Sequence, residues 1–506
     1  MSLDLALSIA RSGLLAVQRN LVQGAQNVAN AETPGYTRKT LPQQSLTAGD
    51  SPAGLRTGEA QRKVDAALTA RLDANRAALA AAELRERLLS GIEQAHGTAE
   101  GGSLADALSD LRNGFIALRE DPADSGKQAQ VMDDARTMAQ RLNGISEAIG
   151  AARQQAQDGI VQEVAAANAA LREIASLTLR IKSAADGNTA ALEDQRDAAI
   201  ARLSESLEVR AVRQPGGDLL LVARGGLVLP LDPDRDVLAT QEATVAPGSF
   251  YGAGGTLPGV TLNGIDITAQ IAGGRLGEYI TLRDRTLPRF QAEADVAAAT
   301  LAHRFAAEGL ALFTDTDGTV PDPSLPYPGS AQIGFAGRIG LNPAVEGNPA
   351  LLRDGTHAVA ATPGGPTAFT PNPPGGPEGF TVLLDRVLDF SFGDSAAAGV
   401  PWPSIPTSGL GPDGSLASPF AAPRTLADYA ARLTAAQTGD RAAATEAKQQ
   451  AEDLRSLLED RFARVSGVDV DAEMAAMISL QNAYAANARV LGTLQSMWDS
   501  LLAAVK

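Results

Sequence analysis

The chain has 506 residues, a formal net charge of −16 at pH 7 and no cysteine. This length exceeds what one hydrophobic core organises and indicates roughly three domains. The acidic balance argues against binding to nucleic acid or to an anionic membrane, and the lack of cysteine excludes disulfides and thiolate metal sites. No stretch of about 20 apolar residues predicts a membrane-spanning helix, and the first residues lack the basic start of a cleaved secretory signal.

A first helix is predicted from Ser2 to Val28 by a heptad pattern of apolar residues. One heptad position holds Leu7, Leu14, Leu21 and Val28, and the position four residues earlier holds Leu3, Ala10, Val17 and Gly24. Such a pattern over about four heptads is typical of a helix that packs along another helix. We expect the helix to end before Pro34, which disfavours helical backbone in its predecessor.

Three further helical stretches are predicted in the next 150 residues. Residues 37–63 are polar and lack a period, which predicts a loop or an extended arm. A helical period returns at Val64, and Ser103 with Asp106 predicts a capping box at the start of the following helix. The longest helix is expected over residues 126–185, where it would span about 90 Å.

One more helix is expected over residues 192–207, and segments typical of β-strands then interrupt the helical pattern. Strands are predicted at residues 209–213, 219–223 and 227–229, because short apolar runs alternate there with Gly-rich turns. Short strands continue to about Thr268. Helix resumes over residues 276–312, with Pro288 starting or kinking it.

Residues 313–423 hold 18 of the 28 prolines of the chain, which excludes long helices. Short strands are predicted at residues 380–384 and 388–392, within an irregular β domain; a disordered insert is the alternative. The run from Asp315 to Gly318 resembles the start of a calcium loop, but Pro326 stands where the bidentate Glu would be needed. We therefore interpret it as an Asp-rich turn.

The last part of the chain predicts two helices. The first covers residues 425–462, and the second follows Asp469, with acidic residues in its first turn where they suit the helix dipole. Its heptad stripe holds Met477, Tyr484, Leu491, Trp498 and Val505, with Met474, Ala488 and Leu502 on the flanking position. Periodicity alone leaves two alternatives open: the terminal helices complete a bundle within one chain, or they pack in an assembly.

Short motifs at the two ends resemble those of the bacterial flagellar rod, hook and hook-associated proteins. The signature residues are Asn27, Asn30, Pro34, Gly35 and Tyr36 near the start, and Ser466, Gly467, Gln481, Tyr484 and Asn487 near the end. The runs at residues 168–177 and 192–197 are similar to a stretch found in the hook-associated branch of this family. Family members usually carry Asn where this chain has Thr178.

The resemblance implies a multidomain α + β fold with terminal coiled-coil helices, a long-helix bundle and inserted irregular β domains. The expected division is a terminal axial domain (1–63 plus 463–506), a helical bundle (64–207 plus 276–312 plus 424–462) and outer β-rich insertions (208–275 and 313–423). The expected assembly interface consists of the two heptad stripes, namely Leu7, Leu14, Leu21, Val28, Met477, Tyr484, Leu491, Trp498 and Val505.

The resemblance also implies a function and partners. We expect a secreted structural subunit, exported through the flagellar type III apparatus and assembled at the hook–filament junction. Its implied partners are further copies in a ring, hook protein below, a second junction protein (hook-associated protein 3) above, and a cytoplasmic export chaperone on the C-terminal helix. A hook or distal-rod protein is the alternative within the family, and a secreted adhesin or enzyme is the alternative outside it.

No motif predicts catalysis, a cofactor or a metal site. His96, His303 and His357 are far apart without ligand spacing, and we interpret each as structural or solvated, with His96 and His357 in polar loops. The sequence contains neither a phosphate-binding Gly-rich loop ending in Gly-Lys-Ser/Thr nor a Gly-x-Ser-x-Gly elbow. We therefore expect no enzyme activity, no cofactor, no nucleic-acid binding and no membrane insertion.

Overall fold

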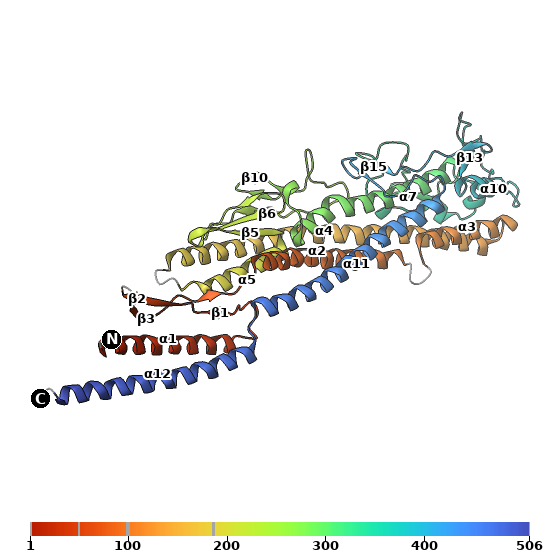
Figure 1. Cartoon of the computed structure of the whole chain (residues 1–506). Helices are drawn as coiled ribbons and strands as arrows, with labels where there is room; N and C mark the ends of the chain where they lie inside the picture. Colours follow the sequence, from red (N-terminus) through yellow and green to blue (C-terminus); the bar gives the residue numbers. More distant parts are fainter. Residues whose placement is uncertain (1–2, 49–50, 98–101, 185–187, 505–506) are drawn as a thin grey trace.

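The computed structural model describes residues 3–48, 51–97, 102–184 and 188–504. Long helices dominate, and several small antiparallel sheets lie along one side of them (Figure 1). The helices are α1 (Leu3–Ala29), α2 (Ala66–His96), α3 (Leu104–Glu120), α4 (Ser125–Ser183), α5 (Ala190–Ser206), α6 (Gly274–Thr281), α7 (Leu287–Ala307), α8 (Pro343–Gly347), α9 (Leu351–Asp354), α10 (Val382–Arg386), α11 (Leu426–Ser466) and α12 (Val470–Ala504).

The strands are short, and most form two-stranded pairs. They are β1 (Lys39–Thr40), β2 (Gln43–Ala48), β3 (Ser51–Thr57), β4 (Gln61–Arg62), β5 (Val209–Arg213), β6 (Leu219–Ala223), β7 (Val228–Leu229), β8 (Leu238–Ala239), β9 (Thr261–Leu262), β10 (Ile265–Asp266), β11 (Phe313–Thr314), β12 (Gly340–Leu341), β13 (Ser395–Ala397), β14 (Val400–Pro401), β15 (Ser408–Leu410) and β16 (Leu416–Ala417).

The helical body consists of α2 to α7 and α11, and its helix boundaries follow local chemistry. Asp65 and Asp124 accept backbone N–H groups at the starts of α2 and α4. The predicted capping box is confirmed, since Ser103 and Asp106 exchange hydrogen bonds at the start of α3. At about 1.5 Å per residue the 59-residue α4 spans nearly 90 Å and forms the spine of the body.

Pro288, predicted to start or kink this helix, lies just after a π-helical turn over residues 282–286 that joins α6 to α7. Pro288 occupies the first turn of α7, and its missing N–H interrupts the hydrogen-bond ladder next to the π-helical turn. Helix α7 then runs through the centre of the body, and almost all of its side chains are buried.

The first β insertion packs on α4. Strand β6 lies between β5 and β7 in an antiparallel sheet, with Val209 opposite Ala223 and Arg213 opposite Leu219. A second sheet has the order β10-β9-β8. Asn168 of α4 ties this sheet to the spine, because its amide donates to the carbonyl of Leu238 and accepts the N–H of Leu238.

The second insertion corrects two strand predictions. Residues 382–386 form α10, and residues 387–391 continue as a π-helical turn. Leu383, Leu384 and Val387 are all fully buried, a spacing that a helix places on one face and a strand does not. The remaining segment alternates short strands with short helices. Its apolar residues join the same core cluster as α3, α4 and α7.

The arm at residues 37–63 is a pair of β-ribbons. The hairpin β2–β3 pairs Gln43 with Thr57 and lies against α1, where the hydroxyl of Ser12 accepts the N–H of Leu55 at 3.1 Å. Strands β1 and β4 pair next to it, Lys39 opposite Arg62. Sequence favoured a loop or an extended arm because Gln, Ser and Thr give no apolar alternation here.

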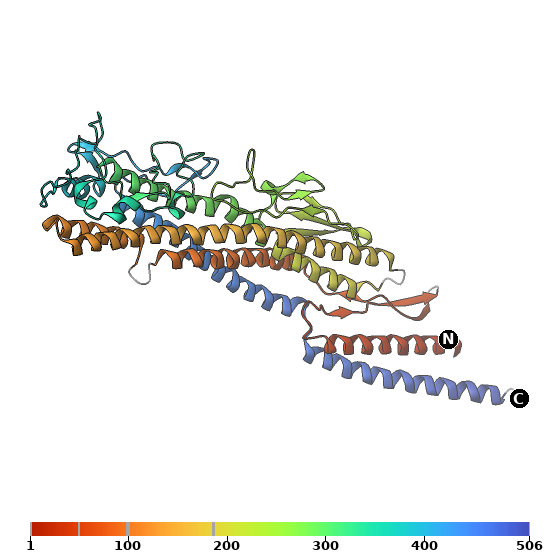
Figure 2. The ribbon, with the colours of Figure 1, turned by 180° about the vertical axis from the view of Figure 1, so that it is seen from behind.

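Helices α1 and α12 lie apart from the body as an antiparallel pair, in both views of the chain (Figures 1 and 2). We call α1, the β2–β3 hairpin and α12 the terminal unit. The chain passes from the terminal unit to the body at residues 62–66, and it returns at residues 466–470 between α11 and α12.

Candidate assembly surface and terminal joint

Small residues on α1 allow α12 to pack closely against it. Gly13 and Gly24 are buried at the contact. A methyl group added to Gly24 would lie 3.2 Å from Cγ of Met477, and one added to Gly13 would lie 3.6 Å from the amide of Asn487. Near the other end of the pair, Leu7 and Trp498 line one shallow pocket with Asp4 and Leu494.

The predicted heptad residues lie at this contact but are only partly covered in the single chain. Leu14, Leu21, Val28, Met477 and Leu491 are half-buried. Leu7, Tyr484 and Trp498 are 38%, 40% and 39% exposed to solvent, so their outer surfaces are uncovered. Val505 lies outside the described residues.

On α1 the companion heptad position is buried more deeply than the position of the large leucines. Ala10 and Val17 are 5% and 8% exposed, and Gly24 completes that position. The centre of the contact is therefore shifted from the large leucines toward small side chains. This shift follows from distance, because only small residues let two helix backbones approach closely.

On α12 the predicted flanking position does not face α1. Met474, Ala488 and Leu502 are exposed. The second heptad position that faces α1 instead holds Glu473, Leu480, Asn487 and Leu494, which are buried or half-buried. Two of these four residues are polar, so an apolar pattern alone could not select this position.

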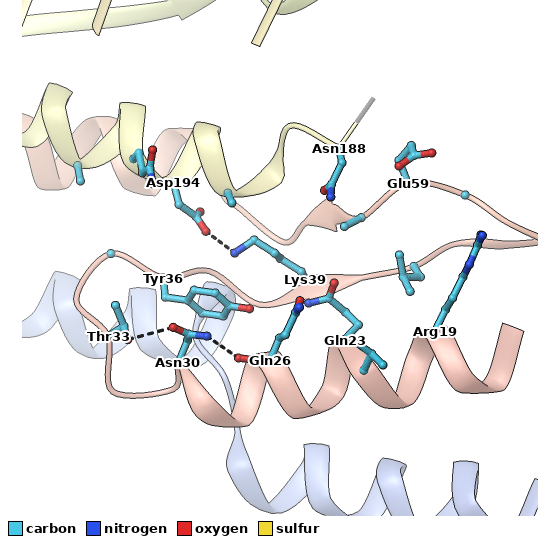
Figure 3. Close-up of a pocket in the computed structure, with 18 of the residues that line it drawn as sticks. Arg19, Gln23, Gln26, Asn30, Thr33, Tyr36, Lys39, Glu59, Asn188 and Asp194 are labelled. Atoms are coloured by element: carbon cyan, nitrogen blue, oxygen red, sulfur yellow. Dashed lines mark hydrogen bonds and ion pairs between the residues drawn. The ribbon is translucent and has the colours of Figure 1, made fainter. Parts of the chain in front are cut away.

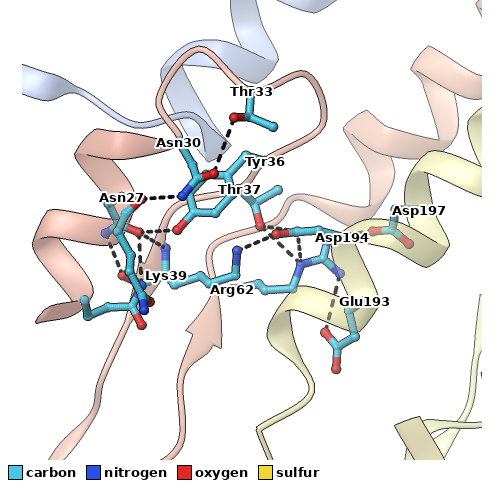
Figure 4. Close-up of polar contacts among 12 residues, drawn as sticks. Asn27, Asn30, Thr33, Tyr36, Thr37, Lys39, Arg62, Glu193, Asp194 and Asp197 are labelled. Atoms are coloured by element: carbon cyan, nitrogen blue, oxygen red, sulfur yellow. Dashed lines mark hydrogen bonds and ion pairs between the residues drawn. The ribbon is translucent and has the colours of Figure 1, made fainter. Parts of the chain in front are cut away.

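The N-terminal signature forms a hydrogen-bonded turn after α1 (Figure 4). Asn27 is 1% exposed, and its Oδ1 accepts the Tyr36 hydroxyl at 2.9 Å and the N–H of Lys39 at 3.2 Å. Its Nδ2 donates to the carbonyl of Lys39 at 2.9 Å. Asn27 therefore binds β1 to the end of α1 as a neighbouring strand would.

The other signature residues shape the turn itself. Asn30 donates to the carbonyl of Gln26 and accepts the hydroxyl of Thr33. Gly35 has φ = 79°, a conformation that strains residues with a side chain. Burial raises the pKa of Tyr36, and the carboxylates of Asp194 and Glu473 raise it further, so the hydroxyl stays protonated and donates to Asn27.

Behind the turn lies a buried charge cluster that sequence reasoning did not single out. We call it the Asp194 cluster; its members are Thr37, Lys39, Arg62, Glu193, Asp194 and Asp197. The Asp194 carboxylate accepts the Thr37 hydroxyl at 2.6 Å, lies 2.5 Å from Lys39 Nζ and lies 2.8 Å from Arg62 Nε. Two cations and a hydroxyl thus share one carboxylate, which removes the cost of burying it unpaired.

Arg62 extends the cluster along α5. Its guanidinium lies 2.6 Å from Asp197 and 3.4 Å from Glu193. Burial alone would lower the pKa of Arg62, but Asp197, Asp194 and Glu193 together raise it above its ordinary value. The Lys39 ammonium also lies 3.6 Å from the centre of the Tyr36 ring. The cluster therefore joins the signature turn to a helix of the body.

The C-terminal signature meets the same turn. Ser466 is fully buried, and its carbonyl accepts the N–H of Arg38 at 2.9 Å. Gly467 ends α11 where a methyl group would lie 2.4 Å from the Ala463 carbonyl oxygen, so a side chain does not fit. Asp469 then caps α12 by accepting the N–H of Ala472, and Arg38 lies 2.5 Å from Glu473.

Of the remaining C-terminal signature residues, Asn487 faces Gly13, whereas Gln481 is exposed and Tyr484 is partly exposed. The sequence signal that could have located this contact between the terminal unit and the body is the polar run at residues 37–39. This run directly follows the N-terminal signature and supplies a hydroxyl and two cations.

A groove of about 1000 Å³ separates α1 from α5 (Figure 3). Its α1 wall carries Gln18, Arg19, Val22 and Gln26, and its α5 wall carries Ala191, Gln195 and Ala198. Tyr36 and Lys39 of the signature turn and Asp194 of the Asp194 cluster also line the groove. The side chains along both walls are mostly amides and small residues.

The structure offers little that could hold a metal ion. No three His, Asp or Glu side chains within the described ranges are grouped as metal ligands. His96 is the last residue of α2 and is fully buried, 2.9 Å from Gln437, so its predicted place in a polar loop is wrong; Gly97 ends the helix only after it. Asp315 forms a turn closed by the N–H of Gly318 and is paired with Arg338.

Helices able to cross a membrane are also not found in the described part of the chain, since none is both long and apolar enough.

Comparison with known proteins gives two family matches. Residues 89–316 match the helical domain of the flagellar hook-associated protein FlgK, and residues 460–504 match the C-terminal region of the flagellar basal body rod FlgEFG proteins. The two matches together span more than half of the chain. The first match covers the end of α2, the helices α3 to α7 and the first β insertion, and the second covers the end of α11 and all of α12.

One curated relative agrees with these matches, and one solved structure is reported with it. Flagellar hook-associated protein 1 of Bacillus subtilis (strain 168) is 24% identical over 252 residues, which is 47% of this chain. The chain spans about half the length of this curated relative, 50%. The flagellar hook junction protein FlgK from Burkholderia pseudomallei aligns in structure with a TM-score of 0.40 and 24% identity, over 50% of this chain and 45% of that one. With signature motifs at both ends and the helical domain between them, the chain belongs to the flagellar hook-associated protein 1 (FlgK) family of axial proteins.

Proposed function

We propose that the chain is a structural subunit of the bacterial flagellum that forms the hook–filament junction by self-assembly through its paired terminal helices. The carrying observation is the apolar surface that the pair leaves uncovered. The exposed large apolar residues of the described parts of α1 and α12 are Leu7, Leu15, Val22, Val470, Met474, Ile478, Tyr484, Val490, Met497, Trp498, Leu501 and Leu502. A surface of this kind on two adjacent helices marks an interaction site.

The exposed residues of α12 lie on both sides of its contact with α1. Met474 and Ile478 extend from one flank, and Val490 and Met497 from the other. A helix with two apolar flanks needs a neighbour on each, as it would have in a ring or tube of identical pairs. The two heptad stripes, with their half-covered side chains, are the proposed assembly interface.

Family membership supports the remaining assignments. We place hook protein on one side of the assembled ring, hook-associated protein 3 on the other, and an export chaperone on α12 before secretion through the flagellar export apparatus. The division into a terminal axial domain, a helical bundle and outer β-rich parts is proposed with them. No catalytic role and no cofactor are proposed.

The position in the flagellum is tested by labelling the exposed turn at residues 363–366 and imaging isolated hook–basal bodies. We expect the label at the distal end of the hook. A label along the rod or the length of the hook would assign the chain another axial role, and absence from the particles would contradict the proposal.

The self-assembly step is tested with two matched variants of α12. Ile478→Glu places a charge on the exposed apolar flank, whereas Asn482→Glu places the same charge one turn further along at an exposed polar position. We expect Ile478→Glu to abolish incorporation at the hook tip and Asn482→Glu to leave it nearly unchanged. Equal incorporation of both would show that this flank is not an interface.

A further inference from the structure

Charged side chains from four helices of the body form one continuous line where those helices meet. In order along the line, they are Glu278 of α6, Arg85 of α2, Asp440 of α11, and Arg289 and Glu293 of α7; we call them the five-charge line. Arg85 lies 3.4 Å from Glu278 and 3.9 Å from Asp440. Arg289 pairs closely with Asp440, and its Nε lies 3.7 Å from the Glu293 carboxylate. Acidic and basic groups therefore alternate along the line, with a carboxylate at each end.

The five-charge line holds one more negative charge than positive charge. Its three carboxylates share two guanidinium groups, and each guanidinium lies between two carboxylates. A proton bound by one carboxylate balances the charges, whereas loss of that proton leaves a carboxylate without a full partner at a place that water reaches poorly. Such a charge is costly because the protein interior solvates it less well than water does.

The two end carboxylates are the groups that take up this proton. Glu293 is fully buried; its Oε2 accepts an N–H of the Gln437 amide at 2.9 Å, but within the described residues its Oε1 has no hydrogen-bond donor. Burial raises the pKa of Glu293, against the opposing effects of Arg289 and Gln437. At the other end, burial raises the pKa of Glu278 from 4.5 to about 7, against the opposing charge of Arg85.

Other ionisable groups near the line are paired or uncharged. Arg441 of α11 lies 3.1 Å from Glu86 and 2.5 Å from Glu93 of α2, and all three side chains are partly exposed. His96 is fully buried, and burial lowers its pKa, so its ring is uncharged above about pH 6.5. Ser418 contributes an uncharged hydroxyl next to the buried end of the line. The surplus charge of the line is therefore not balanced by these neighbours.

Asp440 is the member of the line that α11 contributes, and it shares both arginines with the two end glutamates. When both glutamates are ionised, each arginine is drawn toward the glutamate beside it and holds Asp440 less firmly. When one glutamate is protonated, the arginine beside it is free to close on Asp440. Helix α11 packs along α2 and against α7, the helices that carry the two arginines. The proton therefore changes how strongly α11 is held by its neighbours.

We propose that the five-charge line is a pH-sensitive clamp on α11, in which one proton shared between Glu278 and Glu293 secures Asp440 and loss of that proton loosens the helix. The folded chain binds the proton more tightly than the unfolded chain does. Its contribution to stability is therefore fully present below about pH 4.5 and is lost as the pH rises through about 7. The proposal concerns the helical body of the isolated chain and does not depend on the flagellar assignment.

Hydrogen exchange followed by mass spectrometry tests the clamp on the full chain at pH 6.5 and pH 8.5, a range in which His96 stays uncharged. After correction for the intrinsic pH dependence of exchange, we expect the amides of α11 around Asp440 to exchange about tenfold faster at pH 8.5. Glu278→Gln and Glu293→Gln each remove one end of the line and leave two carboxylates for two arginines. Each variant alone should reduce the pH effect on α11 to less than about twofold.

Two further variants separate the clamp from a simple effect of burying a carboxylate. Asp440→Asn also balances the charges, so it should remove the pH effect although both end glutamates remain. Glu459→Gln removes a carboxylate of the same helix that pairs with Arg455 at the surface, where about half of each side chain is exposed, and it should keep the full pH effect. If Glu293→Gln or Asp440→Asn does not fold, Glu278→Gln still decides, because it removes a costly charge and keeps the size of the side chain.

Three results would overturn the proposal. Equally slow exchange of α11 at both pH values in the parent chain would show that no proton controls this helix. A full pH effect in a folded Glu278→Gln or Asp440→Asn variant would show that the members of the line do not compete for the arginines. Partial effects of Glu278→Gln and Glu293→Gln that add up to the whole would show two independent carboxyl groups rather than one shared proton.

Discussion

Asn27 closes the turn after α1 because its amide satisfies both backbone groups of Lys39 in a site that water does not reach. Replacing Asn27 by Ala leaves that N–H and that carbonyl without partners and also removes the acceptor of the Tyr36 hydroxyl. A buried polar group left unpaired costs about 1–3 kcal/mol. We expect Asn27→Ala to destabilise the terminal unit by about 2 kcal/mol, seen as about 30-fold faster amide exchange in α1 and β1.

Asn30→Ala is the matched control, because the Asn30 amide donates only to a carbonyl of its own helix and is closer to the surface. In the Asn30→Ala variant the amide exchange rates of α1 and β1 should change by less than about threefold. Equal effects of the two substitutions would mean that the bonds between Asn27 and Lys39 do not hold the turn.

A second prediction concerns Glu278 on α6, whose pKa burial raises from 4.5 to about 7, against the opposing charge of Arg85. The folded chain therefore binds this proton more tightly than the unfolded chain does. The resulting stability is fully present below about pH 4.5 and is lost as the pH rises through about 7. Glu278→Gln should raise the free energy of unfolding by about 1–3 kcal/mol at pH 8 and change it little at pH 5.

Urea unfolding at the two pH values measures this difference, and the contrast between variant and parent cancels the other titrating groups. Glu173→Gln is the control, since the Glu173 carboxylate pairs with Arg202 at the surface and is about half exposed. A Glu278 variant whose advantage is the same at both pH values would show that the carboxyl is charged throughout this range.

At the residue scale the sequence could predict local chemistry but not the Asp194 cluster, which connects the signature turn to α5. The capping box of α3 lies within four residues and was predictable. The partners of Asp194 lie 155 and 157 positions away in the chain, at Lys39 and Thr37. No periodicity connects such positions, so only the fold brings them together.

Among the elements, those with long regular patterns were predicted best. The ends of α4 lie within two residues of the expected limits, and β5 and β6 coincide with their predicted strands. Each has a strong local period bounded by turn residues. Residues 380–392 were assigned wrongly because neighbouring prolines and glycines suggested strands, whereas the helical spacing of Leu383, Leu384 and Val387 decided the outcome.

The pairing of α1 and α12 shows what apolar periodicity omits. It located one stripe on each helix but missed the position held by Glu473 and Asn487, because those residues contribute to the contact through polar groups and close backbone approach. The aromatic residues then remain partly exposed in the single chain. The largest side chains of the pair are thus partly uncovered, as the proposed assembly requires.

Trp498 provides the test at this scale. It is 39% exposed and lies beside Leu7 and Leu494 at the far end of the pair, so its removal takes little from the core of the single chain. In an assembly, complete burial of an aromatic residue is worth about 3–5 kcal/mol on truncation. We expect Trp498→Ala to leave the melting temperature unchanged and to reduce incorporation at the hook tip strongly.

Trp402 supplies the comparison, because it is 7% exposed and its indole N–H donates to the carbonyl of Phe390. Trp402→Ala should lower the melting temperature of the body. A Trp498 variant that destabilises the chain yet still assembles would place this residue in an intrachain core and favour a self-contained terminal bundle.

Across the whole molecule, residues 313–423, which we call the Pro-rich region, share one core with the long helices. Phe305 of α7 packs against both Phe313 and Phe392, with ring centres 5.6 Å and 5.3 Å away. The Tyr327 hydroxyl donates to the buried carboxylate of Asp295 on α7, which also accepts the backbone N–H groups of Gly334 and Ala336. The region therefore completes the body on one side, although it interrupts the helices in sequence.

Deleting residues 314–422 and bridging the gap with a short Gly-Ser linker should for this reason unfold the body. Besides uncovering Phe305, the deletion leaves Asp295 without the hydroxyl and backbone donors that offset its burial, and it removes the carbonyl of Gly393 that binds Arg304. The free-energy cost of uncovering a large apolar cluster and two buried charges exceeds the roughly 5–15 kcal/mol by which a typical domain is stable. Circular dichroism should show a large loss of cooperative helix melting.

Replacing only the exposed turn at residues 363–366 by Gly-Ser is the control, and it should melt like the parent. A deletion variant that keeps the parental transition would show that α4, α7 and α11 form a complete core by themselves. The Pro-rich region would then be an independent outer module, and its removal would test surface properties of the assembled junction rather than its folding.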